Sequence, residues 1–161
     1  MELLKLKGRI EKAIQSHPYE YDPLNDMFGL CREYEKVDFD IAHAWNHDLR
    51  PKIAVALQAA VERSDFLAAE RFNDLLYRSF LFGAPHFFDD YLQTVEYGKA
   101  LDKQFYKPRR HYLKRYVDAY QEVLDGKLDF LSISMPKRVV SPSWVSTSPI
   151  CCRASSRIGL R

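Results

Sequence analysis

The segment FYKPRRHYLKRY, residues 105–116, combines basic and aromatic side chains that could contact a nucleotide or a nucleic acid. Basic groups bind phosphate oxygens, and aromatic rings stack on bases. A structural role is the alternative, because Tyr112 and Tyr116 share one helical face, as core residues do. Composition alone leaves both interpretations open. The basic residues of the segment are Lys107, Arg109, Arg110, Lys114 and Arg115.

A pair of histidines is the next candidate. His43 and His47 stand four residues apart, a spacing that places two imidazoles on one face of a helix. A zinc-protease helix would need Glu where Ala44 stands, and no third ligand is indicated by spacing. We therefore interpret both residues as ordinary surface or capping histidines.

Two acidic pairs, Asp38/Asp40 and Asp89/Asp90, could bind a metal or serve in acid–base chemistry. No basic or nucleophilic motif accompanies either pair. We interpret them as solvated loop charges and first-turn helix charges, where carboxylates are favoured. The sequence thus predicts no catalytic residue and no metal ligand.

Apolar residues at helical spacing predict that most of these candidate residues lie on or next to helices. The first helix is expected to end at His17-Pro18. Residues 19–40, which contain Pro23 and Gly29, are interpreted as a loop with a short helical turn.

Two better-marked helices follow. The first starts at Asp48 and has Pro51 in its first turn, where a missing N–H costs little. Asp65 is expected to cap the next helix, which Gly83 and Pro85 close.

The last part of the chain changes character. Residues 87–103 are expected to be helical although Gly98 interrupts them, and a final helix follows Pro108 and is capped by Gly126. LDFLSIS, residues 128–134, is a short apolar run typical of a buried strand. A single strand cannot form a sheet, so either its partners are missing or the run is not a strand.

Charge is unevenly distributed. The chain of 161 residues has 24 Lys and Arg against 22 Asp and Glu, but every acidic residue precedes residue 130. The body is therefore close to neutral and implies no strong overall attraction to nucleic acid.

The cysteines and the apolar runs indicate which class of protein to expect. Cys31, Cys151 and Cys152 show no ligand or disulfide spacing, so reduced thiols in a cytoplasmic protein are expected. The N-terminus does not read as a signal peptide, and no apolar run is long enough for a membrane span.

Residues 38–139 closely resemble the N-terminal part of the large terminase subunits of tailed bacteriophages, the ATP-driven motors that package viral DNA. The most specific matches are WNHDLRP (residues 45–51), FYKPRR (residues 105–110) and the segment that ends in SMPKR (residues 134–138). In that family a helical lead-in precedes an ATPase domain with a central, mostly parallel sheet.

The resemblance implies a phosphate-binding loop of the form SxPxxxGK[ST] after the strand. The next three positions should read Gly-Lys-Ser or Gly-Lys-Thr, but Val140, Ser141 and Pro142 stand there. This difference from the family pattern removes the Gly whose backbone cradles the phosphates, the Lys that contacts the β- and γ-phosphates, and the hydroxyl that binds Mg²⁺. ATP and Mg²⁺ are thus implied for the intact family member, and no turnover is expected here. The residues that match the start of the loop are Ser134, Met135, Pro136, Lys137, Arg138 and Val139.

The resemblance also implies that the segment ahead of the loop contributes to an adenine pocket. The local candidates for adenine or phosphate contacts are Phe105, Tyr106, Arg109 and Arg110. The structural alternative is that FYKPRR docks the lead-in helices onto the sheet of the ATPase domain.

A change of reading frame would explain the departure. If residues 139–142 are encoded GTN-GTA-AGT-CCN, one extra G after the first codon gives Val-Gly-Lys-Ser. We therefore hypothesise that residues 140–161 are a frame-shifted tail; a genuine low-complexity tail is the alternative.

The resulting expectation is a mainly α chain: a helical lead-in, then one strand and the start of a phosphate-binding loop from an otherwise missing α/β P-loop ATPase domain. By resemblance, its partners are viral double-stranded DNA, the small terminase subunit and the portal, in the cytoplasm of an infected bacterium. The alternative function is a non-enzymatic helical adaptor that binds a packaging partner or DNA. Exposed Phe130, Leu131 and Ile133 would favour self-association.

The expected parts are an N-terminal helix and loop (1–37), a helical lead-in (38–127), a strand with a partial loop (128–139) and a frame-shifted or disordered tail (140–161).

Overall fold

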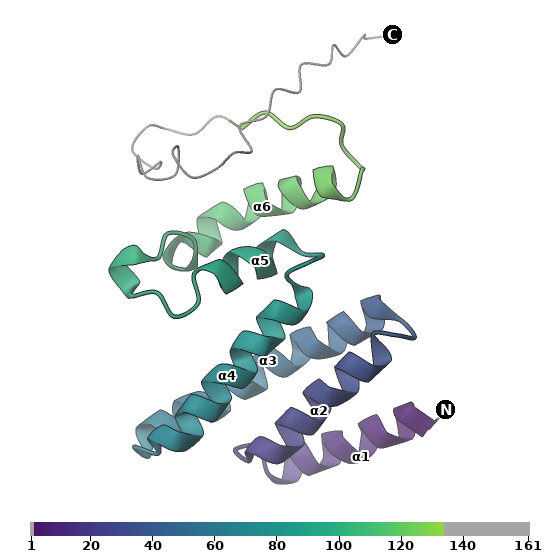
Figure 1. The fold of residues 1–161 in the computed structure, drawn as a ribbon, viewed down its shortest axis with the longest axis vertical. Coiled ribbons are helices and arrows are strands. Elements are labelled where there is room, and N and C mark those ends of the chain that lie inside the picture. The colour runs from purple at the N-terminus through teal and green to yellow at the C-terminus, as the bar shows by residue number, and fades with distance from the viewer. Residues whose placement is uncertain (1, 134–161) are drawn as a thin grey trace. The chain divides into compact units, whose positions relative to one another are not determined.

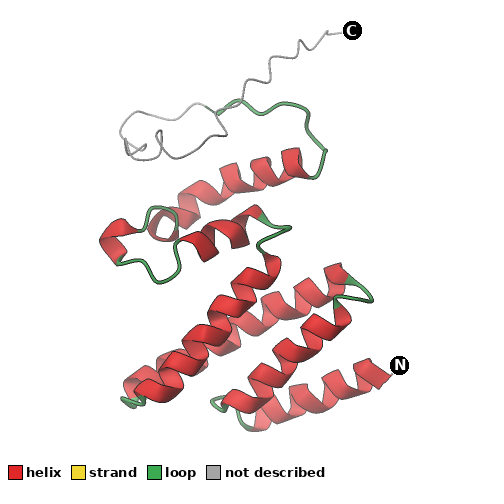
Figure 2. Cartoon of the chain, in the orientation of Figure 1, coloured by secondary structure: helices red, strands yellow, loops and turns green. Residues whose placement is uncertain are grey.

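The computed structural model describes residues 2–133, and within them the chain is helical, with no strand (Figures 1 and 2). The chain divides into two compact units, Met1–His111 and Tyr112–Arg161. The α-helices are α1 (Glu2–Ser16), α2 (Tyr21–Tyr34), α3 (Phe39–Glu62), α4 (Phe66–Gly83), α5 (Phe88–Val95) and α6 (Arg110–Leu124), and two 3-10 turns, η1 (Leu101–Lys103) and η2 (Lys107–Arg109), precede α6.

The first unit has one apolar core built from its four N-terminal helices. Helix α1 packs on α2, α2 packs on α3 and α4, and α4 packs on both α3 and α5 (Figure 1). Each helix contributes the apolar stripe that its sequence period predicts. The buried core residues are Ile10, Ile14, Leu24, Met27, Phe28, Leu30, Leu49, Ile53, Ala56, Ala60, Phe72 and Leu75.

Helix α2 corrects the loop predicted for residues 19–40. Pro23 lies in the first turn of α2, where its missing N–H breaks no helical hydrogen bond. Leu24, Met27 and Phe28 are buried at helical spacing, and their packing outweighs the unfavourable propensity of Gly29. Cys31 is buried on the same helix as a free thiol, and burial raises its pKa to about 11.

Helix α3 corrects the prediction that a helix begins at Asp48. It runs unbroken from Phe39 to Glu62 with Pro51 in its interior, although an interior proline costs roughly 3 kcal/mol. The Pro51 side chain is exposed, whereas Leu49 and Ile53 on either side are buried. Packing of the buried face therefore keeps the helix continuous.

The ends of the helices test the capping residues that the sequence predicts. Asp65 caps α4, because its carboxylate accepts a hydrogen bond from the Ala68 N–H at 3.1 Å. Gly126, just after the end of α6, has the left-handed φ of 70° that a C-terminal cap adopts. Both predicted caps are therefore confirmed. Gly83, in contrast, is the last residue of α4, and its cap residue Ala84 keeps a right-handed φ of −55°.

Residues 128–133 correct the predicted strand. They have no regular secondary structure, and Leu128 and Phe130 are 38% and 53% exposed. A strand needs a neighbouring strand to satisfy its backbone groups, and the described residues contain none. The residues assigned to the loop, Ser134–Val139, and the tail 140–161 lie outside the described part of the chain.

Candidate functional site

A buried ion pair joins α3 to α5. Arg50 Nη1 and Nη2 donate to Asp90 Oδ1 and Oδ2, both at 2.6 Å. Arg50 is 8% exposed and Asp90 is 3% exposed. A bidentate pair of this kind is stronger and more specific in geometry than a single charge contact.

Ser79 of α4 completes this buried network. Its hydroxyl accepts from Arg50 Nε at 3.1 Å and donates to Asn46 Oδ1 at 2.8 Å. Its carbonyl accepts from Asn46 Nδ2 at 2.9 Å and from Arg50 Nη2 at 3.0 Å. Every buried polar group of these side chains therefore has a partner, the condition under which a polar core is stable. We call Arg50, Asp90, Asn46, Ser79 and His43 the Asp90 network.

His43 corrects the surface interpretation of the histidine pair. Its Nε2 lies 3.2 Å from Asp90 Oδ2, and its ring stacks on Phe87 with centroids 3.9 Å apart. His47 is exposed and takes no part. Asp90 lies in the first turn of α5, as predicted, but it is not solvated: its carboxylate is a buried acceptor between two helices.

The Asp90 carboxylate needs Gly83 beside it. A Cβ on Gly83 would lie 1.8 Å from Asp90 Oδ2 and 3.0 Å from His43 Nε2. Burial alone would raise the pKa of Asp90, but the hydrogen bonds and positive charge of His43 and Arg50 outweigh it, so the pKa lies below its ordinary value.

Asp89, the preceding residue, belongs to a second cluster. Its carboxylate accepts from Arg110 Nε at 3.0 Å and Nη2 at 2.8 Å, from the Tyr106 hydroxyl, and from Gln93 Nε2 at 3.0 Å. Burial and the Asp89 carboxylate raise the pKa of Tyr106, so its hydroxyl stays a donor. We call Asp89, Tyr106, Arg110 and Gln93 the Asp89 cluster. Asp89 also lies in the first turn of α5, as predicted, but it is paired within the chain.

Glu96 holds the backbone that carries FYKPRR. Its carboxylate accepts from three consecutive N–H groups, those of Phe105 at 2.8 Å, Tyr106 at 2.7 Å and Lys107 at 2.9 Å. Glu96 is 6% exposed. A buried carboxylate with three donors holds this segment in one conformation.

The four predicted adenine or phosphate contacts are thus close in space but engaged within the chain. Tyr106 is 1% exposed, so its ring offers no face to a base in this conformation. Arg110 is paired with Asp89, and the Arg109 guanidinium lies 5.0 Å from the Phe105 ring centroid. Their role in nucleotide binding stays a prediction.

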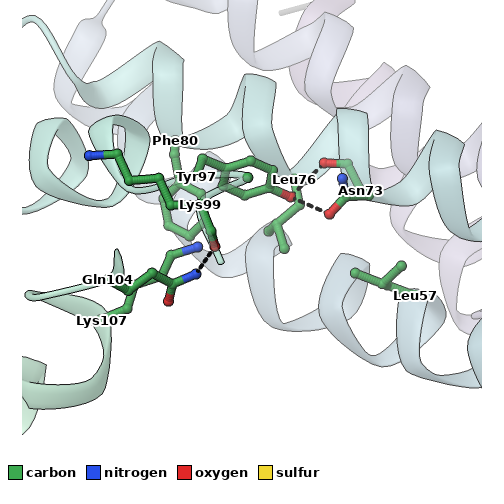
Figure 3. A pocket seen from close by; sticks show the side chains of 9 residues that line it. Leu57, Asn73, Leu76, Phe80, Tyr97, Lys99, Gln104 and Lys107 are labelled. Atoms are coloured by element: carbon green, nitrogen blue, oxygen red, sulfur yellow. Dashed lines mark hydrogen bonds between the residues drawn. The ribbon is translucent and has the colours of Figure 1, made fainter. Parts of the chain in front are cut away.

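An open cleft of about 460 Å³ lies beside this segment (Figure 3). Two helices and the chain after α5 form its walls. The Tyr97 hydroxyl donates to the backbone and side-chain oxygens of Asn73 at 2.7 and 2.8 Å. The lining residues are Leu57 of α3, Asn73, Leu76 and Phe80 of α4, and Tyr97, Gly98, Lys99, Gln104 and Lys107.

The cofactors implied by resemblance have no complete donor set here. Among residues 2–133 no three His, Cys, Asp or Glu side chains gather as a metal site, and Asp38 is instead the N-cap of α3. Ser141 stands where the loop needs its lysine, and Pro142 stands where it needs the Ser or Thr hydroxyl for Mg²⁺. The residues therefore do not fit that cofactor, and we derive no step through it. In the same part of the chain, no helix combines the length and hydropathy of a membrane span.

Comparisons with protein-family models, with curated proteins and with solved structures give no significant match to this chain. Sequence reasoning missed the Asp90 network, because no local signal connects Arg50 to a residue forty positions away.

Proposed function

We propose that residues 38–139 correspond to the helical lead-in of a large terminase subunit, the ATP-driven motor of viral DNA packaging. The resemblance in WNHDLRP and FYKPRR motivates the proposal. One structural observation supports it: these two motifs converge on neighbouring residues of α5. Arg50 of the first motif binds Asp90, and Arg110 and Tyr106 of the second bind Asp89.

This convergence gives both motifs a mechanical purpose. The Asp90 network holds α3, α4 and α5 together through buried side chains. The Asp89 cluster then holds Arg110, the first residue of α6, which precedes the segment 134–139 in the sequence. A motor that couples ATP hydrolysis to movement needs a stable support ahead of its phosphate-binding loop, and in this proposal the lead-in supplies it.

The test begins with the coding DNA downstream of codon 139. We expect that a one-base insertion restores Gly-Lys followed by Ser or Thr, and that the restored chain hydrolyses ATP with Mg²⁺ while the present chain does not. The restored chain with its loop lysine changed to Ala is the matched control. Codons that cannot yield Gly-Lys-Ser or Gly-Lys-Thr under any one-base shift would contradict the proposal.

The adaptor alternative gives a different result in the same samples. A folded state that binds ligand gains stability, so the melting temperature reports binding. The motor proposal expects ATP and Mg²⁺ to stabilise the restored chain. Stabilisation by a packaging partner, with none by ATP in the restored chain, would favour the adaptor.

A further inference from the structure

The cleft beside FYKPRR is not explained by the motifs or by the two aspartate clusters. Its lining combines aliphatic, aromatic, amide and cationic groups from α3, α4 and residues 97–107. In Figure 3 the side chains of Lys99 and Lys107 lie on one side of Tyr97, and Leu57 lies on the other. An occupant would therefore meet positive charge at one end and aliphatic surface at the other.

The aromatic rings of the cleft are not arranged to hold a nucleobase. The Lys107 ammonium lies 4.5 Å from the Tyr97 ring centroid, and Tyr77 and Phe80 lie against the same ring with centroids 5.0 and 6.3 Å away. The Tyr97 hydroxyl is held by Asn73. A base needs a ring face on which to stack, and Tyr97 already has three neighbours against its ring.

The cationic end keeps charge available for an anion. Glu96 is the acidic group that acts on Lys107, but its carboxylate is engaged by three backbone N–H groups. Burial lowers the pKa of Lys107, as expected for a cation with incomplete solvation. Lys99 is exposed at the rim, where Gln104 Nε2 donates to its carbonyl at 2.6 Å.

The helices that carry the aliphatic end have further exposed apolar side chains. Leu57 and Leu76 are partly exposed, and Val61, one helical turn after Leu57 on α3, is 51% exposed. On α4, Phe66 lies seven residues before Asn73 on the same helical face and is 77% exposed. This surface suits an extended or helical segment better than a compact small molecule.

We propose that this cleft binds an acidic peptide segment of a partner protein, with an aliphatic side chain against Leu57 and Leu76 and a carboxylate toward Lys99 and Lys107. Charge complementarity selects an acidic occupant. The Lys107, Tyr77 and Phe80 side chains already lie against the Tyr97 ring, which argues against a stacked nucleotide. Lys107 belongs to FYKPRR, but no lining residue lies in the segment 134–139. The site is argued from its lining alone and does not depend on the terminase proposal.

The test uses the present chain and two fluorescein-labelled synthetic peptides. Both carry leucines at helical spacing, and their remaining positions are glutamate in one peptide and lysine in the other. We expect fluorescence anisotropy to show binding of the glutamate peptide only. Lys99→Glu should weaken it roughly fivefold, as removal of an exposed charge contact does. Lys12→Glu on α1 is the charge-matched control and should leave the affinity unchanged.

Mapping on the unaltered chain keeps the test independent of variant folding. In ¹⁵N spectra the glutamate peptide should shift the amide signals of Gly98, Lys99 and Gln104. Equal binding of the two peptides, equal loss in Lys99→Glu and Lys12→Glu, or shifts confined to other residues would overturn the proposal. Displacement of the peptide by ATP at these amides would overturn it in favour of a nucleotide site. The coding-frame result affects none of these outcomes.

Discussion

Asp89 and Asp90 are consecutive residues of α5 in very different surroundings. Asp90 is 3% exposed and is bound by Arg50 from α3 and by His43. The side chain of Asp89 is 19% exposed, and its partner Arg110 is 40% exposed. One carboxylate belongs to a buried network within the helical body, and the other belongs to a partly exposed cluster.

The difference lies in what each pair contributes to stability. A buried pair is stable only when geometry and additional hydrogen bonds offset desolvation, and removal of one partner leaves an unpaired charge. A partly exposed pair contributes less, because water and salt screen it. The Asp90 network should therefore contribute more to the stability of the helical body than the Asp89 cluster does.

The largest expected effect is on stability, and it tests the difference between Asp90 and Asp89 directly. Asp90→Ala should lower the free energy of unfolding by about 3–5 kcal/mol, because Arg50 stays buried without its acceptor. Asp89→Ala should lower it by about 1–2 kcal/mol. Arg110 can turn to water, whereas the Tyr106 hydroxyl and the buried Gln93 amide lose an acceptor. Urea denaturation followed by circular dichroism measures both. Equal losses in the two variants would show that burial does not separate the two carboxylates.

A smaller effect tests the space that Asp90 requires. Gly83→Ala places a methyl group 1.8 Å from Asp90 Oδ2, so the carboxylate must move and the unfolding free energy should fall by about 1–3 kcal/mol. Gly29→Ala is the matched control, because a Cβ there meets nothing within 4 Å and alanine is the better helix former by up to about 1 kcal/mol. Gly83→Ala as stable as the parent chain would exclude the close approach.

Features that depend on local signals could be predicted from the sequence, whereas features that depend on packing between distant residues could not. Period and capping are local signals, so the stripe of α4, its Asp65 cap and the Gly126 cap were predictable. The continuity of α3 through Pro51 was not, because it depends on packing against α4 rather than on propensity. Helix α2 was missed although its apolar spacing was visible, since Pro23 and Gly29 were given more weight than the period.

The candidate site was less predictable than the helices. Arg50, Ser79 and Asp90 meet only in the folded chain, and each residue alone reads as a surface group. The run LDFLSIS shows the opposite failure: its composition favours a strand, but a strand forms only with a neighbour, which no local pattern supplies.

The smallest expected effect is on the pH dependence of stability. The pKa of Asp90 is lower in the folded chain than the ordinary value of about 3.9 for an unfolded aspartate. Ionised Asp90 therefore stabilises the fold above about pH 4, and this stabilisation is lost as the pH falls through the lower folded pKa. Asp90→Asn should remove this part of the acid slope, a change of less than one proton, measured by urea denaturation at a series of acidic pH values. Ile53→Val, which destabilises the core by about 1 kcal/mol without a titrating group, should keep the slope. If Asp90→Asn also kept it, the network would hold Asp90 by packing and not by charge.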